Sequence, residues 1–400
     1  MRSLRNLLVL MAVGAVFFAG GYRLGEKRLV PANSSTNNVL DLSLMWQVRD
    51  RLKEIYLDKE KIKDKEMTYG AIEGLVASLD DPYTVFLPPK ENKLSTQDLA
   101  GEFGGVGISL GYKDKNLAVM SPLPKTPAEK AGLRAGDLIV KIIDKNNSVD
   151  KDTTGISLDE AVNLIRGKIG TEVVLKIYRE GKNEPFEVTL KRENIVVPSL
   201  ELEMVTKNNK SVAWVKLYKF SERIYEEWPT VVEEINGEKN LAGVVLDLRN
   251  NPGGFLQASV VVASDLLESG VVVTQASSGG KEEQYKVDET KRQLTKPKLV
   301  VLVNGGSASA AEILAGALKY YGRGKLVGEK TFGKGTVQQP EELPDGSGLH
   351  VTVAKWLLPD GKNIHGVGVD PDVVVKYEAP KNPESKVDNQ FDKAVEELLK

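Results

Sequence analysis

The chain has no cysteine and only two histidines, His350 and His365, among its 400 residues. The lack of cysteine excludes disulfide bonds, a thiolate nucleophile, cysteine-ligated zinc and a lipid-bearing cysteine. Two histidines cannot form a three-histidine metal site, and a Ser–His–Asp triad would have to use one of them. Neither lies in a recognisable sequence setting for a triad. We therefore expect no metal and no cofactor.

A strong charge of either sign is also missing. The net charge is −2, and no stripe of lysine and arginine with interleaved aromatic residues occurs. Nothing in the sequence therefore points to nucleic acid as a partner. The hydrophobic content of 41% and charged content of 28% are typical of globular proteins. A chain of this length exceeds one compact core, so two or three domains are expected.

The amino terminus carries the only long apolar run. Seventeen uncharged residues separate Arg5 from Arg23 and would span about 26 Å as a helix. This length is short for a membrane span and slightly long for the apolar part of a signal peptide. Residues 1–30 are therefore expected to be a signal peptide or a membrane anchor, with basic residues on both sides leaving the orientation open. Either reading predicts an extracytoplasmic protein, in the periplasm or at the cell surface.

Residues 31–98 are expected to form a polar linker followed by helices. Apolar residues recur at helical spacing over residues 39–57, and residues 67–79 have the pattern of a second helix. Two short helices cannot bury much surface alone. We expect them to pack on a partner subunit or on the main body.

Residues 99–193 have a different sequence pattern, which predicts short strands, glycine turns and one helix. A glycine-rich turn at 104–107 opens a strand at Ile108, and residues 131–139 read AGLRAGDLI. This region resembles a PDZ domain. Backbone N–H groups after Gly105 can hold a peptide carboxylate while the strand at Ile108 pairs with the peptide. The expected peptide-binding residues are Gly105, Val106, Gly107 and Ile108; the alternative is a structural turn without a ligand.

From residue 194 to 378, buried strands alternate with helices. The expected strands are 212–217, 241–248, 299–303 and 325–327, and the expected helices are 222–234, 255–267 and 310–320. Such alternation predicts an α/β core with buried strands. Within residues 379–400, the segment 388–399 is expected to close the chain as an amphipathic helix.

Ser309 follows a buried strand and a glycine turn and precedes a helix that begins at Ala310. A hydroxyl there lies beside unpaired backbone N–H groups at the positive helix end, which suits an oxyanion. A plain alternative exists, because Ser309 and Glu312 fit the Ser-x-x-Glu capping box. Taken alone, the segment favours the cap.

Lys334 lies between two glycines in a second turn after a short strand. The spacing from Gly328 to Lys334 fits a phosphate-binding loop, but Gly335 stands where that loop needs serine or threonine for magnesium. The other interpretation is a catalytic base. This requires a neutral amine, whose pKa burial would have to lower from about 10.4 towards 7–8. Gln338 is a neutral hydrogen-bond partner for that amine.

A third glycine-rich turn, residues 246–254 (LDLRNNPGG), ends an apolar strand. Glycine pairs there let the backbone approach a ligand closely. An N–H group of Gly253 or Gly254 is expected to join that of Ala310 in an oxyanion hole. Asp247 and Arg249 are interpreted as a structural pair.

Together these features resemble the carboxy-terminal processing, or tail-specific, peptidases. That family couples a PDZ domain with the LDLRxNxGG, SASA and GKG turns, all found here in this order, and the DPYT segment 81–84 also matches its amino-terminal region. The resemblance covers roughly residues 39–374. It implies a multidomain α/β protein in which a PDZ domain is inserted before an α/β serine-protease core, with flanking helical segments.

The resemblance also implies roles for individual residues. The family pattern puts the nucleophile at the second serine, Ser309, rather than at Ser307, with Lys334 as base and Gln338 as its partner. It implies a serine endopeptidase that cleaves proteins near unstructured carboxyl termini and is a homo-oligomer. Arg166 is expected to reach the peptide carboxylate or the protease body. A non-catalytic peptide-binding scaffold is the competing hypothesis.

Overall fold

The computed structural model describes residues 40–123, 125–207, 209–291, 293–378 and 387–400. The expected leader at residues 1–30 lies outside them. None of the helices in the described part is long and apolar enough to cross a bilayer. The chain divides into two compact units, residues 1–68 and 69–400.

The first unit contains α2 (Ser43–Ile55), η1 (Lys59–Lys61) and the start of α3 (Asp64–Ala77). The two helices predicted from apolar periodicity are thus present. No residue of α2 is buried. Its apolar side chains remain exposed, at 68% for Leu44 and 60% for Ile55.

The PDZ region is built on a sheet with the strand order β3-β4-β5-β7-β8, with β6 beside β5. Its elements are β3 (Ile108–Lys113), β4 (Asn116–Pro122), α5 (Pro127–Lys130), β5 (Leu138–Asp144), η2 (Lys145–Asn147), β6 (Val149–Asp152), α6 (Leu158–Ile165), β7 (Glu172–Tyr178) and β8 (Phe186–Lys191). Helices α5 and α6 contribute Ala128, Ala161 and Ile165 to a core that Val173, Leu175 and Ile177 of β7 share. Fully buried residues alternate with more exposed ones along β7, because one face of this strand points into the core.

A second six-stranded sheet carries the carboxy-terminal half of the chain, in the order β10-β11-β12-β15-β16-β19. The strands are β10 (Leu200–Lys207), β11 (Lys210–Leu217), β12 (Leu241–Asp247), β15 (Leu299–Val303), β16 (Lys325–Gly328) and β19 (Val373–Val374). Only the β10–β11 pair is antiparallel. Strands buried on both faces need continuous apolar runs, and all five residues of β15 are buried.

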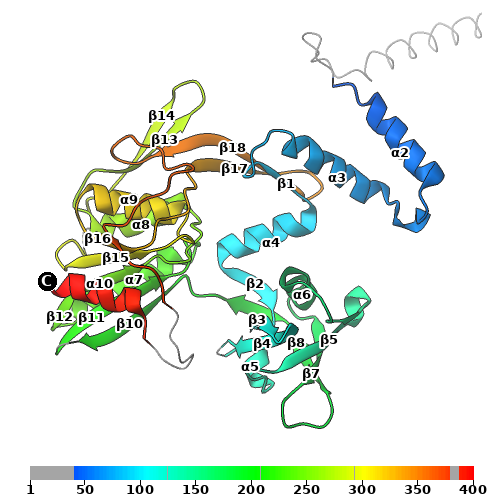
Figure 1. Cartoon of the computed structure of the whole chain (residues 1–400), viewed down its shortest axis with the longest axis horizontal. Helices are drawn as coiled ribbons and strands as arrows, with labels where there is room; N and C mark the ends of the chain where they lie inside the picture. Colours follow the sequence, from blue (N-terminus) through cyan, green and yellow to red (C-terminus); the bar gives the residue numbers. More distant parts are fainter. Residues whose placement is uncertain (1–39, 124, 208, 292, 379–386) are drawn as a thin grey trace, which may run out of the picture. The chain divides into compact units, whose positions relative to one another are not determined.

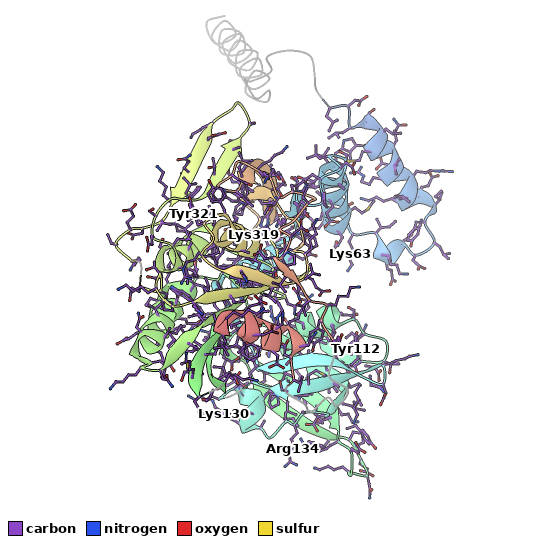
Figure 2. The ribbon with its side chains drawn as sticks, turned by 60° about the vertical axis from the view of Figure 1, so that its left-hand side comes forward. Lys63, Tyr112, Lys130, Arg134, Lys319 and Tyr321 are labelled. Carbon is purple, nitrogen blue, oxygen red and sulfur yellow. The ribbon has the colours of Figure 1, made fainter. Side chains whose placement is uncertain are left out.

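Helices cover both faces of this sheet. On one face lie α7 (Ile224–Gly237), α8 (Leu256–Leu266) and α9 (Ala310–Tyr320), and α10 (Asn389–Leu399) lies on the other. In Figure 1 the red α10 crosses the sheet on the side opposite the yellow α8 and α9. Tyr321, labelled in Figure 2, lies just after α9. Its hydroxyl donates to Val271 O at 3.0 Å. The predicted α/β core is therefore confirmed.

A third sheet, not predicted as such, runs β1-β18-β13-β14 with β17 beside β18. It contains β1 (Val85–Leu87), β13 (Val271–Ser277), β14 (Glu282–Lys286), β17 (Thr336–Glu342) and β18 (Gly348–Leu357). Because β1 pairs with β18, the chain joins the third sheet before it enters the region expected to be a PDZ domain through α4 (Pro89–Ala100) and β2 (Glu102–Gly105). It returns through β9 (Glu193–Val196), which pairs with β2. The PDZ domain is thus an insertion.

The packing of α10 yields a stability prediction. Phe391 of α10 is buried and stacks on Trp214 of β11, with ring centroids 3.9 Å apart. We expect Phe391→Ala to lower the free energy of unfolding by about 3–5 kcal/mol, because it leaves a cavity against the sheet. Denaturant unfolding measures the change. The exposed Glu396→Ala on the same helix is the control, and a Phe391→Ala loss below about 1 kcal/mol would contradict this packing.

Candidate active site

Three loops meet at one edge of the six-stranded sheet. They follow the carboxyl ends of the neighbouring parallel strands β12, β15 and β16 and comprise residues 248–254, 304–309 and 329–335. Parallel neighbours end at the same edge, which is where open α/β sheets place their ligands. The topology therefore brings together the three glycine-rich turns that the sequence singled out.

Ser309 occupies a strained turn at the start of α9. Its φ is +54° and its ψ is −118°, although an N-cap residue normally has extended backbone. One half of the capping box is formed, because the side chain of Glu312 accepts the N–H of Ser309, whereas the Ser309 side chain makes no capping hydrogen bond. A cap alone does not require a non-glycine residue at positive φ, which costs on the order of 1–3 kcal/mol and concentrates at functional sites. The geometry thus accommodates the cap and a nucleophile at the same residue.

The carboxylate of Glu312 joins the serine turn to the lysine turn. Glu312 is fully buried and accepts four hydrogen bonds. Its Oε2 accepts the N–H groups of Ser309 at 2.9 Å and Lys334 at 2.8 Å. Its Oε1 accepts the N–H of Gly333 at 2.7 Å and the hydroxyl of Thr331 at 2.5 Å. One oxygen atom therefore lies between the backbones of the two residues predicted to be nucleophile and base.

The glycine pair lies directly against the serine turn. A Cβ added to Gly253 would stand 2.8 Å from the Cβ of Ser309 and 3.0 Å from the nitrogen of Ala310. The N–H of Gly253 donates to Asn251 Oδ1 at 2.9 Å. The N–H groups of Gly254 and Ala310 donate to no described residue. Of the predicted oxyanion donors, Gly254 and Ala310 are therefore the ones available to a ligand.

Asn251 was not predicted as a site residue, yet it fixes this arrangement. It is fully buried, and its Nδ2 donates to Leu217 O at 2.8 Å while its own carbonyl accepts the N–H of Ala308 at 2.9 Å. The side chain of Asn251 thus ties the end of β11 to the Gly253 turn, and its backbone carbonyl ties this turn to the serine turn. The asparagine of the LDLRxNxGG pattern was the available sequence signal.

Ser307 is occupied by a structural bond. Its buried hydroxyl donates to Leu248 O at 2.8 Å and accepts the N–H of Asn304 at 3.0 Å. Of the two serines in this turn, Ser309 is therefore the one whose hydroxyl is available to a ligand.

Lys334 has the surroundings that a neutral amine requires. It is half-buried, and its Nζ makes no hydrogen bond or ion pair with any described residue. Burial lowers the pKa of Lys334 below the ordinary lysine value, and the nearby charge of Asp81 opposes this only in part. The Nζ lies 5.0 Å from the ring centroid of Tyr83.

Gln338 is near this lysine but bonds elsewhere. Its amide donates to Thr336 Oγ1 at 2.9 Å and to Thr352 Oγ1 at 3.1 Å. The expected hydrogen bond to Lys334 is not formed here, and both amide hydrogens are directed to threonine hydroxyls. The side-chain oxygen of Gln338 accepts from no described residue.

The two histidines lie near Lys334, which sequence reasoning missed. Burial and then the charge of Lys334 lower the pKa of His350, so this half-buried side chain is neutral at neutral pH. His365 meets the ring of Tyr83 edge-on, with centroids 5.8 Å apart. No hydrogen bond joins either ring to Ser309 among the described residues. No group of three or more metal-ligating side chains occurs in the described part of the chain.

All five predicted peptide-binding residues line one small groove of the PDZ region, of about 60 Å³, together with Phe103, Leu110, Val162 and Ile165. The N–H groups of Val106 and Gly107 donate to no described residue, whereas both carbonyls are bonded. The guanidinium of Arg166 stacks over Phe103 of β2 at 3.7 Å. The groove therefore offers free donors and an arginine that reaches the β2–β9 ribbon.

Comparison with known proteins agrees with this geometry. Residues 211–375 match the family model of Peptidase family S41, and residues 104–190 match that of the PDZ domain. The carboxy-terminal processing protease CtpA of Bacillus subtilis is 37% identical over 89% of this chain and 73% of its own length. The carboxyl-terminal-processing protease of Synechocystis is 40% identical over 81% of this chain and 74% of its own. The chain belongs to peptidase family S41.

A solved structure supports the same assignment. The photosystem II D1 C-terminal processing protease matches with a TM-score of 0.51 and 33% identity, over 87% of this chain and 96% of that one. The chain is thus a serine protease of the carboxy-terminal processing type, with its PDZ domain before the S41 protease domain. The predicted family, fold class and enzyme class are confirmed.

In this S41 peptidase, Asp247 and Arg249 form the ion pair interpreted from the sequence as structural. The shortest contact between them is 2.6 Å, and Arg249 also binds Asp388 at 2.8 Å. Asp388 is the N-cap of α10. The pair therefore fixes the closing helix to the end of β12.

The position of Glu312 makes a testable prediction for this S41 peptidase. Glu312→Gln replaces an accepting oxygen by an NH₂ group, so at least one of the two turns loses its partner. We expect kcat to fall about 100-fold, comparable to the loss of an oxyanion donor. Steady-state kinetics and thermal unfolding measure activity and folding separately. Glu329→Gln in the neighbouring turn is the control, and near-normal turnover by folded Glu312→Gln would contradict the role of this carboxylate.

Proposed function

We propose that this peptidase cleaves protein substrates near unstructured carboxyl termini with Ser309 as nucleophile and Lys334 as base. The observation that carries the proposal is the Glu312 carboxylate, which clamps the backbones of both residues. The abutting Gly253–Gly254 turn adds support, because the N–H of Gly254, like that of the adjacent Ala310, donates to no described acceptor.

In the proposed reaction, the neutral amine of Lys334 takes the hydroxyl proton as Ser309 Oγ bonds to the scissile carbonyl carbon. The N–H groups of Ala310 and Gly254 stabilise the negative charge on the carbonyl oxygen. As the C–N bond breaks, the lysine ammonium returns the proton to the leaving amine. Water then releases the acyl group by the same base. Gln338 is proposed to receive the amine through its unoccupied side-chain oxygen, and no cofactor is invoked.

The proposed dyad is tested by Ser309→Ala and Lys334→Ala separately. We expect each to lower kcat/KM by at least about 1,000-fold, because the nucleophile and base act as one unit. In the unmodified protein, kcat/KM should rise with pH through a pKa below that of free lysine, since only the neutral amine accepts the proton. The control is Lys330→Ala, an exposed lysine of the same turn. Proteolysis retained by either dyad variant would overturn the assignment.

We further propose that the PDZ groove binds the substrate tail and controls the protease site. Two chain segments connect the PDZ domain with the protease domain, one before it and one after it. Both of them contact residues 219–223. Lys219 forms an ion pair with Asp98, and Arg223 lies 3.7 Å from Glu102 of β2. On the return crossing, the hydroxyl of Ser199 bonds that of Ser221 at 2.5 Å.

The same segment holds the proposed oxyanion glycines. The N–H of Phe220 donates to Gly253 O at 2.9 Å, and its carbonyl accepts the N–H of Phe255 at 2.7 Å. Phe220 is fully buried. A displacement of the β2–β9 ribbon would therefore reach the glycine pair through a rigid, short connection, which supports gating by the PDZ domain.

Tail recognition is tested with Arg166→Ala and a pair of substrates that differ only in a free or amidated carboxyl terminus. We expect the unmodified enzyme to prefer the free carboxylate by about tenfold, the value of a charge-assisted hydrogen bond, and Arg166→Ala to lose the preference. The ratio of kcat/KM values measures it. Lys168→Ala, an exposed neighbour, is the control, and an unchanged ratio in Arg166→Ala would remove the arginine from this role.

We propose that residues 1–30 direct export of the protein, as a signal peptide or a membrane anchor. We also propose that the protein assembles into a homo-oligomer. The support is the apolar run flanked by arginines and the exposed apolar side chains of α2. Apolar residues at heptad-like spacing, such as Leu44, Val48 and Ile55, are typical of helix–helix association.

A further inference from the structure

The DPYT turn, residues 81–84, is a rigid element without an assigned task. The carboxylate of Asp81 accepts the N–H of Tyr83 at 3.0 Å and the hydroxyl of Thr84 at 2.7 Å. Thr84 is buried, and its Oγ1 accepts the N–H of Thr352 in β18 at 3.0 Å. The turn is therefore fixed internally and fixed to the strand beside the lysine turn.

Tyr83 projects from this turn to the lysine. The Nζ of Lys334 lies 5.0 Å from the ring centroid, within the range of a cation–π interaction. His365 packs against the ring edge-on at 5.8 Å between centroids, which restricts the ring from another direction. Since the amine has no hydrogen bond among the described residues, this ring is the contact that the structure provides for it.

The charges around the amine come from three elements. Asp81 lies in the DPYT turn, and hydrogen bonds from Thr352 and Thr84 bring its pKa below the ordinary value despite burial, so it is ionised. His350 lies on β18 and is neutral. Glu312 of α9 binds the backbone of Lys334. Burial disfavours the ammonium, whereas Asp81 and the electron-rich ring face favour it.

We propose that Tyr83 is a positioning residue for Lys334: its ring holds the amine and stabilises the ammonium formed when the lysine takes the proton of Ser309. The inference rests on the proposed dyad. During acylation the Ser309 O–H bond breaks, the proton moves to Nζ, and it leaves with the departing amine. The ring takes no proton at any step: it contacts the amine and stabilises the charged form of the lysine over the neutral form. Asp81 supplies the neighbouring negative charge and fixes the ring through the turn.

The test compares Tyr83→Leu with Tyr83→Phe, which keeps the ring. We expect Tyr83→Leu to lower kcat about tenfold with little change in KM, and to move the acid limb of the kcat/KM profile to lower pH, because the ammonium loses stabilisation. Tyr83→Phe should retain the kcat and the acid limb of the unmodified enzyme. Asp81→Asn should move the acid limb in the same direction as Tyr83→Leu.

A second measurement separates this inference from the dyad. The pH dependence of amine-reactive labelling at Lys334, followed by peptide mapping in the Ser309→Ala background, reports the pKa of the lysine without catalysis. A lower pKa in Tyr83→Leu but not in Tyr83→Phe supports the inference. An unchanged labelling pKa, or a Tyr83→Phe protein as impaired as Tyr83→Leu, overturns it even if the dyad holds. Proteolysis by Lys334→Ala would instead overturn the dyad.

Discussion

The buried carboxylate of Glu312 is the constraint on which the candidate site depends. It sits at the first turn of α9, where the positive end of the helix favours a negative group. Its four donors come from the serine turn and the lysine turn, so neither turn can shift alone without leaving a buried donor unpaired. Such a loss costs on the order of 1–3 kcal/mol per group, which is large beside the total stability of a domain.

The sheet topology makes this clamp possible. Strands β12, β15 and β16 are adjacent and parallel, so the three loops that follow them share one edge. Asn251 then holds the glycine turn against the serine turn, and Glu312 holds the lysine turn on the other side. The third sheet adds the DPYT turn, which presents Tyr83 and Asp81 to the lysine. Burial lowers the pKa of this amine, and the charge of Asp81 opposes that shift in part.

The inserted PDZ domain is connected to this site by a short route. Its entry and exit strands pair with each other, and both crossings contact residues 219–223. Phe220 in that segment is hydrogen-bonded on both sides of the Gly253–Gly254 pair. The proposed peptide groove and the proposed oxyanion turn are therefore joined through one short segment, residues 219–223, and this connection supports the proposed gating.

The sequence by itself determined the family, the main elements of the α/β core and the three turns in which the candidate residues lie. Apolar runs predicted the buried strands, glycine turns marked the three loops, and the Ser309–Glu312 spacing predicted the capping box, because these signals are local. Only the tertiary structure decided that Glu312 also binds Gly333 and Lys334, that Gly254 rather than Gly253 keeps a free N–H, and that Tyr83 faces a lysine 251 positions later. These contacts depend on strand order and side-chain direction, which no local pattern encodes. The histidines show the same limit, since their isolation in sequence gave no sign that both would lie beside the lysine.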